Sequence, residues 1–146
     1  MIELNPTHTQ KSTPPLRILP VLERLKSIYL LWYGYYQSLP KSHRHSLGKR
    51  IDNLLVESIE AIAIASFLSR QEKRPYVCVA IRKVDTLKIM LMILWETKSL
   101  DNKKYIALSG PIDEIGRMLG GWNGQLTKSL GQTGNKQNSP AKAEEK

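Results

Sequence analysis

The segment PYVCVAIRKVDTLKIMLMILW, residues 75–95, sets the fold class of this chain. Its apolar side chains recur every three or four residues, which is the spacing of one face of an α-helix rather than the alternation of a strand. Pro75 suits the start of such a helix, where its missing N–H does no harm. The apolar face comprises Val77, Ala80, Ile81, Val84, Leu87, Leu91, Leu94 and Trp95. The segment therefore predicts a long amphipathic helix opened by Pro75.

Helical spacing continues on both sides of this segment. Apolar residues keep the same period over 21–39, 47–68 and 105–122. Pro20 suits the first position of the first helix, and Pro40 ends that helix. Four amphipathic helices of about 16 to 24 residues, joined by short loops, predict an all-α fold, namely an up-down-up-down antiparallel four-helix bundle.

The last predicted helix carries its own boundary signals. Asp101 or Asn102 is a suitable N-cap. The pair Gly120-Gly121 predicts the C-terminal end, because glycine readily adopts the backbone conformation that closes a helix. Gly110-Pro111 lies between these signals and should kink or split the helix, since proline removes one backbone hydrogen bond.

Two polar tails frame the bundle in this interpretation. Residues 1–15 contain three prolines and several threonines without any periodicity. Residues 123–146 consist mostly of Gly, Asn, Gln, Ser, Lys and Glu, a composition that buries too little apolar area to offset the entropy of ordering. The sequence thus predicts a disordered N-terminal tail at 1–15, a bundle at 16–122 and a disordered C-terminal tail at 123–146.

Two predicted helices are more apolar than a monomeric bundle requires. Tyr29–Tyr36 reads YLLWYGYY and Ile89–Trp95 reads IMLMILW, so both are apolar around most of the helix. A helix that is hydrophobic on all sides is normally buried on more than one face. In a chain of 146 residues the second buried face predicts contact with another subunit, and hence a homo-oligomer. A large core with some exposed apolar residues is the simpler alternative.

Composition limits the cellular setting and the class of partner. The chain has a formal net charge of +9, which favours an anionic partner such as nucleic acid, a membrane surface or an acidic protein. Of this charge, residues 16–122 carry +7. The single cysteine, Cys78, forms no internal disulfide and provides no thiolate zinc site. No signal sequence or membrane-spanning run is visible. We therefore expect a cytoplasmic protein without a membrane partner.

The cations gather in a few short stretches. The densest is the loop KSHRHSLGKR, residues 41–50, which has four fixed positive charges and no acid. Smaller clusters are Arg70/Lys73/Arg74, Arg82-Lys83 and Lys103-Lys104. Arginine binds phosphate oxygens in a forked geometry and lysine adds point charge. These stretches are candidate nucleic-acid contacts, although each taken singly is also compatible with a solvated helix face.

Neither catalysis nor metal binding has support in the pattern. His43-x-His45 lacks a third ligand, so no metal site and no cofactor are predicted. The carboxylates lie on polar faces beside cations, as Asp113 and Glu114 do with Arg117 on the next turn. Catalytic carboxylates need burial or like-charge pairing, which this arrangement does not predict. A small helical mutase of the chorismate mutase type, with Arg, Lys and Glu in a bundle, is the enzyme alternative, and we expect no enzyme.

Two stretches resemble a known family. LPKSHRHSLGKRIDNLL, residues 39–55, and YIALSGPIDEIGRMLGGW, residues 105–122, are similar to the accessory variability determinant (Avd) proteins of diversity-generating retroelements. The resemblance covers about residues 16–122 and extends to the four-helix-bundle proteins encoded in ribosomal-RNA intervening sequences. Gly110-Pro111 departs from the usual family pattern.

The Avd resemblance implies a non-catalytic bundle assembled as a homopentameric barrel. It implies binding to the element's reverse transcriptase and to its template RNA, with cDNA as a further possible ligand, in support of mutagenic cDNA synthesis and retrohoming. The alternative is a nucleic-acid-associated bundle of the ribosomal-RNA intervening-sequence type that has no reverse-transcriptase partner. The family's functional surface consists of Lys and Arg, which transfers here to Lys41, Arg44, Lys49, Arg50, Arg74, Arg82 and Lys83.

Overall fold

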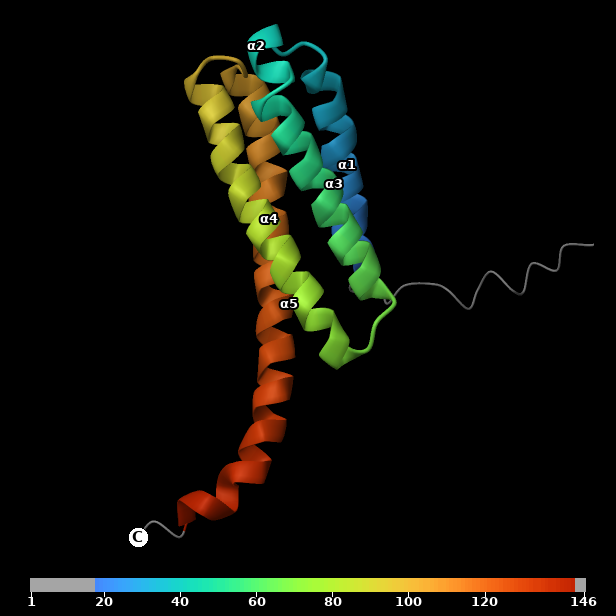
Figure 1. Ribbon diagram of the computed structural model, residues 1–146, viewed down its shortest axis with the longest axis vertical. Helices are drawn as coiled ribbons and strands as arrows, with labels where there is room; N and C mark the ends of the chain where they lie inside the picture. Colours follow the sequence, from blue (N-terminus) through green and yellow to red (C-terminus); the bar gives the residue numbers. More distant parts are fainter. Residues whose placement is uncertain (1–17, 144–146) are drawn as a thin grey trace, which may run out of the picture.

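The computed structural model describes the backbone of residues 18–143 and the side chains of residues 20–129. It contains the helices α1 (Ile18–Tyr36), α2 (Lys41–Arg44), α3 (Leu47–Ser66), α4 (Arg70–Glu96) and α5 (Asn102–Ala143). No strand occurs in these described residues, and the predicted all-α class is confirmed. The four long helices alternate in direction along the chain, as Figure 1 shows, while α2 is a single turn between α1 and α3.

The four long helices enclose one apolar core. α3 and α5 each pack against both α1 and α4, so the bundle has four sides and a shared centre. Trp32 of α1 is fully buried there, and its indole N–H donates to Asp52 Oδ1 at 3.3 Å. Most apolar positions identified on the segment 75–95 supply the α4 face of this core, with Ala80, Leu87 and Leu94 at 0% exposure, whereas Trp95 is 37% exposed.

The start of α4 differs from the prediction. The helix begins at Arg70, and Pro75 lies inside it rather than at its opening. Ser69 is the N-cap, and the Glu72 carboxylate accepts a hydrogen bond from the Ser69 backbone N–H at 3.4 Å. This capping arrangement satisfies N–H groups at the helix end, so the helix starts five residues before the proline. Pro75 then removes only one backbone hydrogen bond close to that end.

Helix α5 also differs from its prediction. It is continuous through Gly110-Pro111, so the helix is not split there, and it does not end at Gly120-Gly121 as predicted. It runs to Ala143 and thus includes most of the segment 123–146 assigned to a disordered tail. The predicted tail at 1–15 and residues 144–146 lie outside the described residues.

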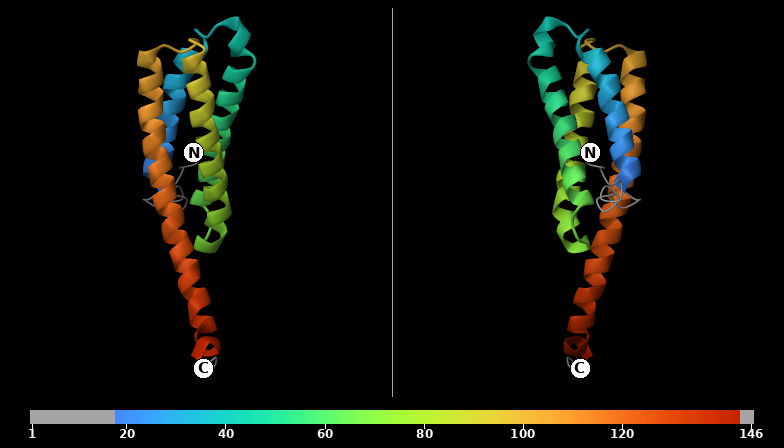
Figure 2. Two further views of the ribbon diagram at one scale, coloured as in Figure 1. Left: turned by 90° about the vertical axis from the view of Figure 1, so that its left-hand side faces the viewer. Right: turned by 90° about the vertical axis from the view of Figure 1, so that its right-hand side faces the viewer.

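Apolar packing explains why α5 passes the two glycines. Leu126 is only 5% exposed and packs with Ala65 and Val77, while Trp122 contacts the same cluster. Leu119, Trp122 and Leu126 follow one another at helical spacing, so the buried stripe crosses the predicted boundary at 122. Figure 2 shows from two sides that α5 continues beyond the ends of its neighbours.

Several large apolar side chains of the single chain face outward. Phe67, Ile106 and Leu30 are 67%, 66% and 63% exposed. Contact with a second subunit remains a prediction for these positions. None of the described helices has the length and apolar character to cross a membrane.

Candidate nucleic-acid interface on helices α3 and α4

The fold separates the seven predicted site residues into two groups. Arg50, Arg74, Arg82 and Lys83 lie on α3 and α4, which pack side by side in the bundle. The second group, Lys41, Arg44 and Lys49, belongs to α2 and to the first turn of α3. The first group lines two adjoining hollows, and it is therefore the candidate interface.

Side chains of both helices line one part of the hollow, and side chains of α4 alone line the other. One part has a volume of about 260 Å³ and is lined by Arg50, Leu54, Val79, Arg82, Lys83 and Thr86. The neighbouring part has a volume of about 490 Å³ and is lined by Gln71, Arg74, Pro75, Cys78, Val79 and Arg82. Because Val79 and Arg82 line both parts, the two form one strip, which we call the α3–α4 groove. No acidic residue is among these lining residues.

Two arginines of the groove carry uncompensated charge. Arg74 and Arg82 are exposed, and within the described part of the chain neither makes an ion pair. They lie eight residues apart on α4, which corresponds to about 12 Å along the helix axis. An extended chain of phosphates can contact both arginines in succession, whereas a small anion meets both only if the two long side chains converge on it. The spacing thus favours a polymeric anion over a small one.

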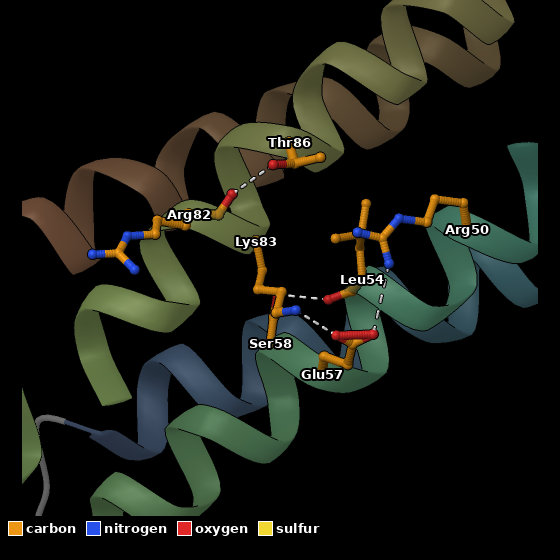
Figure 3. A network of polar contacts seen from close by, with 7 residues as sticks. All are labelled: Arg50, Leu54, Glu57, Ser58, Arg82, Lys83 and Thr86. Carbon is orange, nitrogen blue, oxygen red and sulfur yellow. Dashed lines mark hydrogen bonds and ion pairs between the residues drawn. The ribbon is translucent and has the colours of Figure 1, made fainter. Parts of the chain in front are cut away.

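The other two cations of the groove share one carboxylate. Figure 3 shows Glu57 of α3 between Lys83 and Arg50. Lys83 Nζ lies 2.5 Å from Glu57 Oε2, and Arg50 Nη1 lies 3.9 Å from Glu57 Oε1. Arg82 is adjacent in sequence to Lys83 but points away from this network. The groove therefore contains free cations at Arg74 and Arg82 and compensated cations at Lys83 and Arg50.

The second group of predicted residues has a partly structural role. Lys41 and Lys49 are exposed, whereas Arg44 is half-buried. Arg44 Nη2 donates to the Leu39 carbonyl at 3.0 Å, and the Tyr36 hydroxyl donates to the Arg44 carbonyl at the same distance. These bonds hold α2 against the end of α1. One nitrogen of the Arg44 guanidinium is thus engaged, while its buried Nε has no hydrogen-bond partner among the described residues.

This end of the bundle brings together cations that the sequence analysis treated apart. His43 Nδ1 and Ser99 Oγ lie 2.5 Å from each other, which ties α2 to the turn between α4 and α5. Lys104 Nζ donates to Ser38 Oγ at 3.4 Å and lies 5.4 Å from the centre of the Tyr35 ring. Lys41 and Lys104 consequently occupy the same end of the bundle, although they are far apart in sequence.

Asp113 and Glu114 pair with cations of neighbouring helices. Glu114 pairs with Arg24 of α1 at 2.5 Å, and Asp113 lies 3.7 Å from Lys88 of α4. The predicted pairing of both with Arg117 on the same helix is therefore wrong, because cations of neighbouring helices lie within reach. No group of three or more potential metal ligands occurs in the described residues.

Asp52 is engaged with aromatic residues of α1. Its carboxylate accepts the Trp32 indole N–H. Burial, together with a hydrogen bond to Asp52 and the negative charge of that carboxylate, raises the pKa of Tyr29 above its usual value. Tyr29 and Trp32 of α1 thus both interact with one carboxylate of α3.

Comparison with known proteins gives one finding. A family model described as bAvd-like matches residues 20–126. Neither the search of curated proteins nor the search of solved structures returned a match. The matched range contains α2, α3 and α4 in full, most of α1, and the part of α5 that packs on the bundle up to Leu126. Since the match covers well over half of the chain, the protein belongs to the bAvd-like family, whose members are Avd-type accessory variability determinant proteins.

Proposed function

We propose that the protein is a non-catalytic accessory factor of a diversity-generating retroelement. In this role it binds the element's reverse transcriptase and template RNA and supports mutagenic cDNA synthesis and retrohoming in the cytoplasm. Membership of the bAvd-like family supports the accessory role, an association with a reverse transcriptase and oligomerisation in general. The homopentameric barrel, the RNA ligand and the use of particular residues are further parts of the proposal.

The observation that carries the RNA part of the proposal is the unpaired Arg82 at the junction of the two parts of the groove. It lines both, and the unpaired Arg74 stands two helical turns away in the same strip. Guanidinium groups bind phosphate oxygens in a forked geometry. An RNA backbone that follows α4 can contact both arginines in succession. Binding through the phosphates depends little on the base sequence.

The structure also determines which substitutions test this proposal. Charge reversal of Lys83 would place a second carboxylate beside Glu57, so a loss of binding could result from repulsion within the protein. Arg74 and Arg82 lack ion pairs among the described residues and can be neutralised without that complication. The informative variant is therefore Arg74→Gln/Arg82→Gln.

We expect this variant to bind single-stranded RNA more weakly and with less salt dependence. Each phosphate contact on a single strand contributes about 0.7 to the slope of log affinity against log salt, so two lost contacts reduce the slope by about 1.4. Fluorescence anisotropy with a labelled RNA across a salt series measures this. The matched control is Arg117→Gln/Lys128→Gln, which removes two exposed cations of α5. Equal slopes for both variants would refute the assignment of RNA to the α3–α4 groove.

The reverse-transcriptase partner has a separate test. Co-purification of the wild-type chain with the enzyme encoded beside it, with and without the template RNA, measures the association directly. We expect a stable complex. A chain that binds RNA but never retains the polymerase would instead fit the ribosomal-RNA intervening-sequence type of bundle protein.

A further inference from the structure

Glu57 lies beside the α3–α4 groove and contacts two of the cations that line it. Its two carboxylate oxygens face two different cations, Lys83 through Oε2 and Arg50 through Oε1. Both cations also line the hollow where a bound anion would lie. A phosphate group would offer the same two cations the same kind of oxygen. The carboxylate and an incoming phosphate therefore compete for one pair of donors.

The Glu57 contacts are open to such competition. The side chains of Lys83, Glu57 and Arg50 are 28%, 37% and 49% exposed, so water and a ligand can reach all three. Ion pairs at this exposure contribute little to folding, since solvent screens them. The fold itself rests on the apolar core around Trp32 and Leu87, and it does not depend on Glu57.

Comparison with Arg82 indicates how the Lys83–Glu57 ion pair affects anion binding. Arg82 follows the same strip without an ion pair in the described residues, whereas its neighbour Lys83 is paired. An anion that meets only Lys83 and Arg50 must displace Glu57 and gains little net attraction. An anion long enough to contact Arg74 and Arg82 as well gains two uncompensated charges. The groove consequently discriminates by the length of the anion.

We infer that Glu57 is a specificity-determining residue, an internal competitor that limits the groove to extended polyanions and weakens its binding of short ones. This inference rests on the proposed binding of RNA, and it adds a regulatory carboxylate to that site. When an RNA backbone enters, a phosphate replaces Glu57 at Lys83, and Glu57 turns toward solvent. No covalent step is involved.

The test is the isosteric variant Glu57→Gln, which keeps the shape and removes the charge. We expect single-stranded RNA to bind about two- to fivefold more tightly, the range that corresponds to one exposed ion pair. In the wild type the freed Glu57 carboxylate offsets part of the counterion release at Lys83, so the salt slope of the variant should be steeper by up to about 0.7. Inorganic phosphate and a mononucleotide, used as competitors, should displace RNA from the variant at lower concentration than from the wild type.

The matched control is Glu114→Gln. It makes the same change of charge, but Glu114 pairs with Arg24 between α1 and α5, away from the groove. If both variants gain affinity equally, the effect is one of net charge and the inference is wrong. A second check is Lys83→Gln in each background. It should cost little in the wild type and should abolish the gain in Glu57→Gln.

Failure of this inference can be told apart from failure of the proposed function. Suppose that the wild type binds RNA and that Arg74→Gln/Arg82→Gln weakens this binding. If Glu57→Gln then has the same RNA affinity as Glu114→Gln, only the inference about Glu57 is overturned. If Glu57→Gln strengthens capture of the reverse transcriptase but leaves RNA affinity unchanged, the anion is a protein carboxylate and the inference is likewise overturned. If wild type and all variants lack salt-dependent RNA binding, the proposed function itself fails.

Discussion

At the scale of single residues, Trp32 links sequence pattern, packing and polar satisfaction. It lies in the aromatic segment 29–36, is fully buried, and places its one polar atom against Asp52. Its ring contacts Tyr36 with a centroid distance of 5.7 Å. A buried indole thus joins α1 to α3 through both apolar contact and a hydrogen bond.

We expect Trp32→Ala to reduce the free energy of unfolding by about 3 to 5 kcal/mol, the range for removal of a large aromatic side chain from a core. Denaturant unfolding followed by circular dichroism measures the change. Tyr33→Ala is the control, because Tyr33 is the next residue and is 55% exposed. Similar losses for the two variants would contradict the assignment of Trp32 to the core.

At the scale of helices, the sequence predicted periodicity better than boundaries. The apolar faces at 21–39, 47–68 and 75–95 correspond to the buried faces of α1, α3 and α4. Pro75 does not mark the start of α4, because Ser69 and Glu72 cap the helix before it. Gly120-Gly121 does not end α5, because Trp122 and Leu126 pack with Val77 and Ala65, which are distant in sequence.

The candidate site shows the same limit. Each of its cations was identified from local charge density. Their grouping was not, because Glu57 and Lys83 are 26 residues apart and meet only when α3 packs on α4. Local sequence indicates which residues are cationic, whereas helix packing determines which of those charges are already compensated.

The extension of α5 past its glycines has a measurable energetic consequence. Leu126 is the buried residue that anchors this part of the helix, so Leu126→Ala should reduce stability by about 2 kcal/mol, the low end for such truncations at the edge of a core. Thermal unfolding is the measurement. Thr127→Ala is the matched control, since Thr127 is exposed and its hydroxyl donates to the Asn123 carbonyl of its own helix. No loss in Leu126→Ala would place the end of the bundle at 122 after all.

At the scale of the whole molecule, charge and apolar exposure have to be considered together. The single chain exposes Leu30, Phe67, Ile89 and Ile106 by more than half of their surface. Scattered exposed apolar residues are ordinary. However, α1 and α4 also contain the two segments, 29–36 and 89–95, that are apolar on most sides. Assembly of several copies would cover such faces and repeat the α3–α4 groove around the oligomer.

We expect sedimentation velocity at micromolar concentration to give a mass several times that of the 16.6 kDa chain. Leu30→Glu should shift the distribution toward the monomer if α1 forms the subunit contact, because a buried charge without a partner is costly. Its circular dichroism should stay helical, since Leu30 is 63% exposed in the single chain. A wild-type chain that sediments at the monomer mass would refute oligomerisation.

The two ends of the bundle are held unequally. At one end α2 is tied to the turn between α4 and α5 through His43 and Ser99, while at the other end α5 continues alone past its neighbours. A lone helix of this length is only marginally stable in water, because few residues offset the cost of nucleation. Amide hydrogen exchange should therefore run as a gradient along α5, slow near Tyr105, fast after Leu126. One end of the bundle would then be rigid, while the free end of α5 would unfold and refold locally. The backbone motion of the chain would increase along this one helix toward its C-terminal end.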